Sequence, residues 1–480
     1  MVKYLPAQIV PGIVGFITIP IITRLFAPGE YGDYVLVIST VGVFSTIVGW
    51  LSMPIKRFYP AYERDKKLDE FYETVLKMTF ISILVLSLLF LGALLLLKSH
   101  ISPRLYALIY IGVPVFILTS CFGVLVEFLR AKRQISWYSD FMVWKSVTAV
   151  SFGILLVIIF DFGIDGLLWG SVLSLVIGFP FLWRISLGKV SLNAKSISTP
   201  LVSEMARYGF PLVIGNLAAW ILSLSDRYVL EFLRGSREVG IYSASYSISE
   251  HSIMLLSTLF ALTSGSIVYN IWEKKGEKKS QEFMSKLTRY YLLVGIPAVV
   301  GLSALAKPFV NTLTGQEYHG GHKIIPLIAL GAFFLGLQQR FHPGLNFYKK
   351  THFIMFCVVV SGLFNLGLNF LLIPKYGYIA AAVTTLLSYV LLLVLVIFVS
   401  RRFFVWEFPF KSLAKAICAS SVMGIAVYHV GNSLTSSTLS NLILGTVVGV
   451  AVYSLMLFLF QELKPSEIQA LFDSKTKIGK

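Results

Sequence analysis

Four basic side chains lie within or at the ends of long apolar stretches of this sequence. They are Arg24, Arg57, Lys145 and Arg227. A charged side chain at membrane depth is energetically costly, so each of them is a candidate functional residue. A guanidinium is a planar, permanently charged fork that suits phosphate or carboxylate groups, whereas an ammonium acts as a point charge. We therefore expect these residues to bind an anionic ligand.

Each of these cations also has a purely structural interpretation. Arg24, Arg57 and Lys145 would extend to the membrane interface, where long basic side chains usually place their charge. Arg227 would instead form a local ion pair with the preceding Asp226. The sequence leaves both interpretations open.

Three further ionisable side chains, Asp226, Glu250 and His251, also fall within apolar stretches. A carboxylate at that depth is a candidate proton or cation site, and histidine titrates near physiological pH. We predict an ion-coupling role for these residues. A satisfied polar pair inside the helix bundle is the alternative for Glu250 and His251.

Amide side chains form the last group of candidates: Gln338, Asn365 and Asn369. Amides both donate and accept hydrogen bonds, so they suit the hydroxyl groups of a sugar. Asn365 and Asn369 are four residues apart and should share one helical face. Hydrogen bonding between helices is the alternative, at about 1 kcal/mol or less per contact. His319 and His322 lack a third ligand nearby, so no metal site is expected.

The elements that hold these residues are predicted to be membrane-spanning helices. Hydrophobic residues make up 56% of the 480 residues and charged residues 14%, against roughly 25% charged in soluble domains. About fourteen apolar stretches have close to the 20 residues that cross a bilayer. We expect an all-α polytopic membrane protein.

The net charge of +17 follows the expected topology. Lysine and arginine are about three times as frequent on one side of the predicted spans as on the other. Arg340 counts among the loop charges of the richer side. This distribution predicts that both termini are cytoplasmic, and it argues against a nucleic-acid partner.

An internal repeat predicts the arrangement of the helices. LFAPGEYGDY (25–34) aligns without gaps to LRGSREVGIY (233–242), with the same Leu, Glu, Gly and Tyr. Two further pairs of segments match in the same order, 131–134 with 348–351 and 162–174 with 376–388. Because an even number of spans separates the copies, we expect two six-helix lobes related by a pseudo-twofold axis along the membrane normal.

The predicted division of the chain follows from this repeat. It comprises an N-lobe with spans 1–6 (1–187), a cytoplasmic linker (188–204), a C-lobe with spans 7–12 (205–402), and spans 13 and 14 with a cytoplasmic tail (403–480). The P-loop pattern G-x-x-x-x-G-K-[ST] does not occur in the sequence, so ATP is not the expected energy source.

Three segments of the sequence carry a resemblance to a known family. They are PIITRLFAPGEYGDYVLVIST, DRYVLEFLRGSREVGIYSASYSIS and LFNLGLNFLLIPKYGYIAAAVTTLLSYV. Together they resemble the Wzx-type polysaccharide flippases of the multidrug/oligosaccharidyl-lipid/polysaccharide exporter superfamily. The chain departs from the family pattern at Ile379, where a glycine is common.

This resemblance implies a transporter and not an enzyme. The implied fold is a twelve-helix core of two lobes plus two C-terminal helices. The implied activity is export of an undecaprenyl-diphosphate-linked oligosaccharide from the inner to the outer leaflet. From the residues we expect alternating access, with the diphosphate held by Arg24 and by Arg57 or Lys145. No cofactor is expected, and a proton or sodium gradient or the membrane potential would supply the energy.

The expected function also leads to expectations about the membrane, the oligomeric state and the partners of the protein. We expect a monomer in a bacterial or archaeal cytoplasmic membrane, working with the polysaccharide polymerase machinery. The alternative is a cation-coupled multidrug efflux antiporter of the same superfamily. That function would favour a carboxylate-lined cavity, whereas basic residues outnumber acidic ones here.

Overall fold

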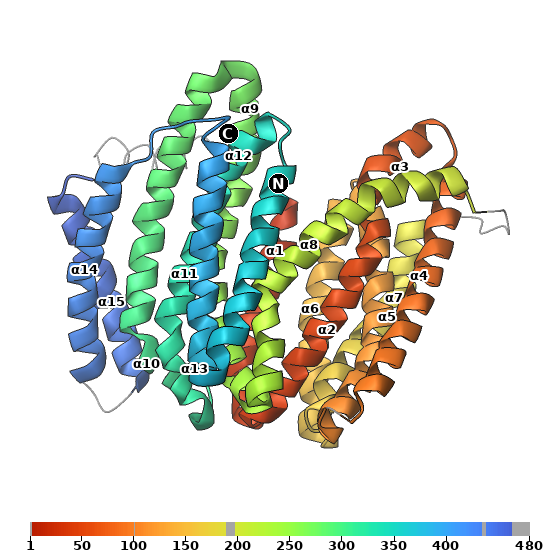
Figure 1. The fold of residues 1–480 in the computed structure, drawn as a ribbon, viewed down its shortest axis with the longest axis horizontal. Helices are drawn as coiled ribbons and strands as arrows, with labels where there is room; N and C mark the ends of the chain where they lie inside the picture. The colour runs from red at the N-terminus through yellow and green to blue at the C-terminus, as the bar shows by residue number, and fades with distance from the viewer. Residues whose placement is uncertain (1, 100, 189–196, 434–437, 463–480) are drawn as a thin grey trace. The chain divides into compact units, whose positions relative to one another are not determined.

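The computed structural model describes residues 2–99, 101–188, 197–433 and 438–462, and every regular element in those ranges is a helix (Figure 1). Twelve of these helices are long and apolar enough to cross a membrane. The prediction of an all-α polytopic membrane protein is confirmed.

The chain divides into two compact units. Unit 1 comprises Met1–Ser243 and Val358–Ala381, and unit 2 comprises Ala244–Cys357 and Ala382–Lys480. This division follows packing and does not test the predicted lobe boundaries, which stay predictions. Residues 189–196 of the predicted linker lie outside the described residues.

Eight helices belong to unit 1, together with the 3-10 turn η1 (Val2–Tyr4) and residues 236–243 and 358–381. They are α1 (Leu5–Leu25), α2 (Pro28–Ser52), α3 (Ile55–Arg64), α4 (Leu68–Leu97), α5 (Pro103–Ala131), α6 (Ile135–Phe160), α7 (Asp165–Leu187) and α8 (Thr199–Arg234). Large aromatic side chains, among them Phe71 and Phe128, fill the core where α4 and α5 meet. Between membrane-spanning helices such packing stabilises the contact mainly through van der Waals attraction.

Unit 2 holds the remaining elements. They are most of α9 (Ser236–Ala304), α10 (Ala306–Leu313), the 3-10 turn η2 (Gln316–Ile324), α11 (Ile325–Gln338), the 3-10 turn η3 (Gln339–Phe341), α12 (His342–Phe347), both ends of α13 (His352–Ser400), α14 (Phe410–Ser433) and α15 (Thr438–Leu459). Helices α14 and α15 pair with each other, and α10 packs against α15.

Two of these helices are too long to be single membrane spans. At 1.5 Å per residue the 69 residues of α9 would extend about 100 Å, against a hydrocarbon core of about 30 Å. Gly276 in α9 (φ 77°) and Gly377 in α13 (φ 56°) interrupt the helical geometry with positive φ angles, and α9 doubles back on itself in Figure 1. Each helix therefore supplies two spans, which accounts for the fourteen expected from the sequence.

The repeated segments contact each other directly within unit 1. A Cβ added to Gly32 would lie 2.0 Å from the carbonyl oxygen of Ser236, and one added to Gly240 would lie 1.9 Å from that of Pro28. In the alignment of the repeats Gly32 corresponds to Gly240, and Pro28 to Ser236. The contact is therefore reciprocal, as a pseudo-twofold relation requires.

Candidate functional site

Lys145 of α6 lines a cavity of about 290 Å³ inside unit 1. The walls come from α2, α5 and α6 and are rich in small polar side chains. The polar lining residues are Ser45, Ser52, Thr119, Ser120, Glu127, Tyr138 and Lys145. A cation among hydroxyl groups in a concave site is an arrangement that binds anionic, hydroxyl-rich ligands.

The charge of Lys145 is not neutralised by a carboxylate. Its Nζ lies 5.4 Å from the centroid of the Phe122 ring, and no described acidic group is within ion-pair distance of it. Glu127 lines the same cavity but pairs with Arg130 at 2.7 Å and with Lys56 at 3.5 Å. Glu127 and Arg130 are three residues apart on α5, a spacing that favours an ion pair on one helical face. The positive charge of Lys145 is therefore available to attract an anionic ligand.

Helix α6 is held in a fixed rotation by its neighbour α7. The indole nitrogen of Trp144 donates to the Ser174 carbonyl oxygen at 3.1 Å, and the Thr148 and Ser174 hydroxyls are 2.6 Å apart. Gly178 makes room for the Trp144 ring, since a Cβ there would lie 2.8 Å from Nε1. These contacts flank Lys145 on both sides and set the direction of its side chain.

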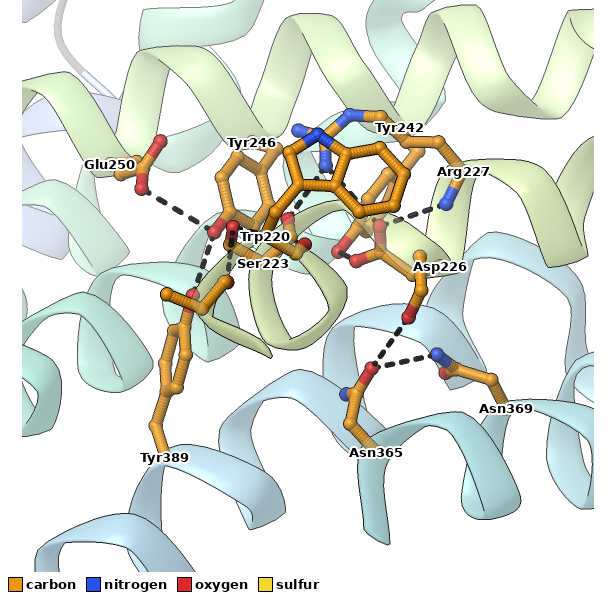
Figure 2. A network of polar contacts seen from close by, with 12 residues as sticks. Trp220, Ser223, Asp226, Arg227, Tyr242, Tyr246, Glu250, Asn365, Asn369 and Tyr389 are labelled. Carbon is orange, nitrogen blue, oxygen red and sulfur yellow. Dashed lines mark hydrogen bonds and ion pairs between the residues drawn. The ribbon is translucent and has the colours of Figure 1, made fainter. Parts of the chain in front are cut away.

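A second polar group in unit 1 surrounds the adjacent residues Asp226 and Arg227 of α8, both almost fully buried (Figure 2). The Arg227 guanidinium donates to Asp226 Oδ1 at 3.2 Å and to the Ser223 carbonyl oxygen at 2.9 Å. The Tyr242 hydroxyl donates to the other Asp226 oxygen. The geometry is that of a buried ion pair within the helix, and the predicted roles of both residues stay predictions.

The two asparagines of α13 share one helical face, as their spacing predicts. Asn369 Nδ2 donates to Asn365 Oδ1 at 2.9 Å (Figure 2). Ser225 Oγ lies 3.4 Å from the same oxygen. The Asn365 amide nitrogen is buried and makes no hydrogen bond to a described residue. That donor can still form a hydrogen bond that the described residues do not supply.

Glu250 and His251 are half-buried in the part of α9 that belongs to unit 2. The Tyr246 hydroxyl lies 3.5 Å from Glu250 Oε1 and 3.0 Å from the Tyr389 hydroxyl (Figure 2). His251 Nδ1 lies 2.6 Å from the Ser247 carbonyl oxygen one turn earlier. Their ion-coupling role also stays a prediction.

Arg24 and Arg57 are exposed on unit 1. Arg24 occupies the last turn of α1, and Arg57 stacks over the Tyr208 ring at 4.7 Å from its centroid. Cation–π contact holds a guanidinium in place without neutralising its charge. Both positions are compatible with an interface role or with a ligand role.

Gln338 lies in unit 2 beside Arg340. The expectation that Arg340 is a loop charge is wrong. Its side chain is only 3% exposed, so it is not a loop charge. It lies over the rings of Phe260 and Tyr291 in the protein interior. The sequence offers one weak signal of this burial, because two glutamines precede Arg340 in an otherwise apolar span.

Comparison with known proteins identifies the family. A family model described as "Polysaccharide biosynthesis protein" matches residues 3–267, more than half of the chain. The chain belongs to this polysaccharide biosynthesis protein family. A second model, MatE, matches residues 211–371.

Two relatives of this chain carry names that refer to glycan biosynthesis. "Probable low-salt glycan biosynthesis flippase Agl15" of Haloferax volcanii is 21% identical over 351 residues, which cover 72% of each chain. "Succinoglycan biosynthesis transport protein ExoT" of Rhizobium meliloti is 21% identical over 460 residues, which cover 92% of this chain and 89% of ExoT. Both are named as transporters.

The fold of this polysaccharide biosynthesis protein is that of the exporter superfamily. The structure of lipid II flippase MurJ in an inward closed conformation superposes with a TM-score of 0.81 at 18% identity. The match covers 96% of this chain and 99% of MurJ. The family expected from the sequence segments is thereby confirmed, and so is the fold.

Proposed function

We propose that this protein is a flippase that exports an undecaprenyl-diphosphate-linked oligosaccharide across the cytoplasmic membrane by alternating access. The observation that carries the proposal is the Lys145 cavity, in which a cation without a carboxylate partner lies among hydroxyl groups. A diphosphate supplies the missing negative charge, and the glycan supplies hydrogen-bonding hydroxyls. The names of Agl15 and ExoT support the same class of substrate.

The other predicted site residues have auxiliary roles in this proposal. Arg24 and Arg57 attract the diphosphate from exposed positions, and Arg227 contributes from its buried pair. Gln338, Asn365 and Asn369 hydrogen bond to sugar hydroxyls, with the unsatisfied amide of Asn365 as the best placed donor. Asp226, Glu250 and His251 are the candidates for coupling to a proton or sodium gradient.

The proposal extends to the surroundings of the protein. Both termini lie in the cytoplasm, on the side where lysine and arginine are most frequent. The protein acts as a monomer and delivers its glycan to the polysaccharide polymerase machinery.

A cation-coupled multidrug antiporter is the second candidate function, and the MatE match over residues 211–371 favours it. Such a transporter needs anionic or aromatic groups that attract a cationic drug. Lys145 and Arg340 place uncompensated positive charge at two cavities, which would repel that substrate. The flippase therefore fits the charges better.

Transport in proteoliposomes tests the two functions against each other. The purified protein is reconstituted with undecaprenyl diphosphate that carries a fluorescent oligosaccharide, and a membrane-impermeant reductant bleaches the outer leaflet. A flippase exposes the labelled lipid from the inner leaflet, whereas empty liposomes do not. Efflux of ethidium without movement of the labelled lipid would show that the antiporter assignment is right and the flippase proposal wrong.

A further inference from the structure

Unit 2 contains a polar cavity of about 380 Å³ that none of the roles above uses beyond Gln338. It lies where both segments of α9 face η3 and the start of α12. Its polar lining consists of Ser264, Tyr269, Gln338, Gln339, Arg340, His342 and Asn346. The volume is within the range of small-ligand sites in proteins.

Arg340 is the only cation among these lining residues, and it has no acidic partner. No described carboxylate lies within ion-pair distance of its guanidinium, and one Nη donates to the Ser257 carbonyl oxygen at 3.3 Å. Its Nε is buried and makes no hydrogen bond to a described residue. An arginine that is 97% buried and unpaired is destabilising unless an anion completes the site.

The groups around Arg340 are amides and hydroxyls. His342 Nε2 lies 2.6 Å from Gln338 Oε1, and Asn346 Nδ2 donates to the Tyr269 hydroxyl at 2.8 Å. These bonds orient the amides at the cavity wall, while the Gln339 amide makes no hydrogen bond to a described residue. The lining therefore offers one positive charge and several neutral donors and acceptors.

We propose that this cavity binds the carboxylate of an acidic sugar. The Nε edge of Arg340 would pair with the carboxylate as a bidentate fork, and the amides would bind the ring hydroxyls. A carboxylate carries one negative charge, which matches the single arginine of this lining. The inference rests on the proposed function, because it assigns a uronic-acid-type residue to the exported glycan.

Binding of free sugars to the purified full-length protein tests the inference. Thermal unfolding is followed against glucuronic acid, glucose and inorganic phosphate, and apparent Kd values are compared among variants. Gln339→Glu keeps the size of the side chain but adds a carboxylate to the lining that Gln339 shares with Arg340, so it repels a bound anion. We expect it to weaken glucuronate binding at least about tenfold, the effect of losing one charge-assisted contact.

Two further variants complete the experiment. Gln134→Glu makes the same change at an exposed position of unit 1 and should bind glucuronate as the wild type does. Arg340→Gln should lose glucuronate binding. If that variant fails to fold, the binding measured for Gln339→Glu tests the inference on its own.

Several results would overturn the inference. They are equal binding of glucose and glucuronate, tighter binding of phosphate, no glucuronate binding by the wild type, or unchanged binding by Gln339→Glu. The proposed function is tested separately by flipping of a neutral lipid-linked oligosaccharide. If the protein flips the neutral lipid-linked oligosaccharide but does not bind glucuronate, the acidic-sugar site is refuted and the proposed function is not.

Discussion

Lys145 and Arg227 are both basic residues inside apolar helices, but they differ in how their charge is neutralised. Arg227 forms a pair with Asp226 and donates to the chain one turn earlier. Lys145 has only the face of Phe122. An unpaired charge in a partly buried site lowers stability, and it persists where function needs it. The contrast makes Lys145 the stronger candidate for contact with substrate.

Replacing Lys145 by glutamine should separate activity from stability. Glutamine retains hydrogen bonding but removes the charge, so we expect flipping of the diphosphate lipid to fall at least about tenfold. The midpoint of thermal unfolding should stay the same or rise, because an uncompensated charge is removed. Initial flipping rates in proteoliposomes and thermal unfolding of the same preparation measure both effects. A variant with wild-type flipping would remove Lys145 from the site.

The residue scale is also where the sequence was least informative. The spacing of Asn365 and Asn369 was enough to place them on one face, because helical periodicity is local. The burial of Arg340 was not predictable in the same way. It depends on Phe260 and Tyr291, which are distant in sequence and approach it only through the packing of α9. Whether a cation has a carboxylate partner is likewise a property of packing.

At the scale of elements, the repeated glycines bring two helix starts together. Gly32 and Gly240 allow α2 and α9 to approach at backbone distance, so we expect Gly32→Ala or Gly240→Ala to destabilise unit 1 by about 1–3 kcal/mol or more. Thermal unfolding and the yield of monodisperse protein measure this. Gly42→Ala in α2 is the matched control, since its Cβ would meet nothing within 4 Å. It should be neutral or stabilising by up to about 1 kcal/mol. Equal effects at all three positions would contradict the packing role.

Glu462 links the end of the described chain to two helices of unit 2. It accepts from Arg289 of α9 at 2.8 Å and pairs with Lys415 of α14 at 3.1 Å, and Ser412 also donates to it. Burial raises the pKa of Glu462, but the bonds from Ser412, Arg289 and Lys415 outweigh that effect and hold the pKa below its ordinary value of 4.5. The ionised form is therefore the one that ties α14 to α9.

This linkage predicts a pH dependence with a definite sign. A lowered carboxyl pKa contributes stability that is fully present above the unfolded pKa and is lost as the pH falls through the folded pKa. Wild-type protein should unfold a few degrees above Glu462→Gln at pH 6–8, and the difference should shrink below about pH 4.5. Thermal unfolding across pH measures it. A difference that grows on acidification would show that the sign is wrong.

Helix positions were predictable from the sequence because apolar length and charge placement suffice for membrane spans. The turns inside α9 and α13 fall at Gly276 and Gly377, because glycine adopts a positive φ at little cost. The alignment of the repeats did not predict the reciprocal contact of Gly32 and Gly240. A repeat predicts that two segments are equivalent, and only packing brings the equivalent segments into contact with each other.

At the scale of the whole molecule, the charge of the substrate decides how the membrane potential acts on the proposed transport. The protein returns to its starting state in each cycle, so only the substrate and any coupled ion have moved charge across the bilayer. Moving one elementary charge through 100 mV changes the free energy by about 2.3 kcal/mol. An anionic diphosphate lipid that leaves a negative interior therefore moves downhill, whereas a cationic drug would move uphill.

We expect a potential that is negative inside to accelerate export of the labelled diphosphate lipid, and the reversed potential to slow it. Potassium gradients with valinomycin set the potential in proteoliposomes, and proton and sodium gradients are imposed separately. Acceleration by the potential alone would mean that Asp226, Glu250 and His251 are not needed for coupling. An export rate that is independent of the potential but rises with a proton or sodium gradient would show instead that a coupled ion supplies the energy. In that case Glu250→Gln, which removes the charge of the half-buried carboxylate, should abolish the response to the gradient.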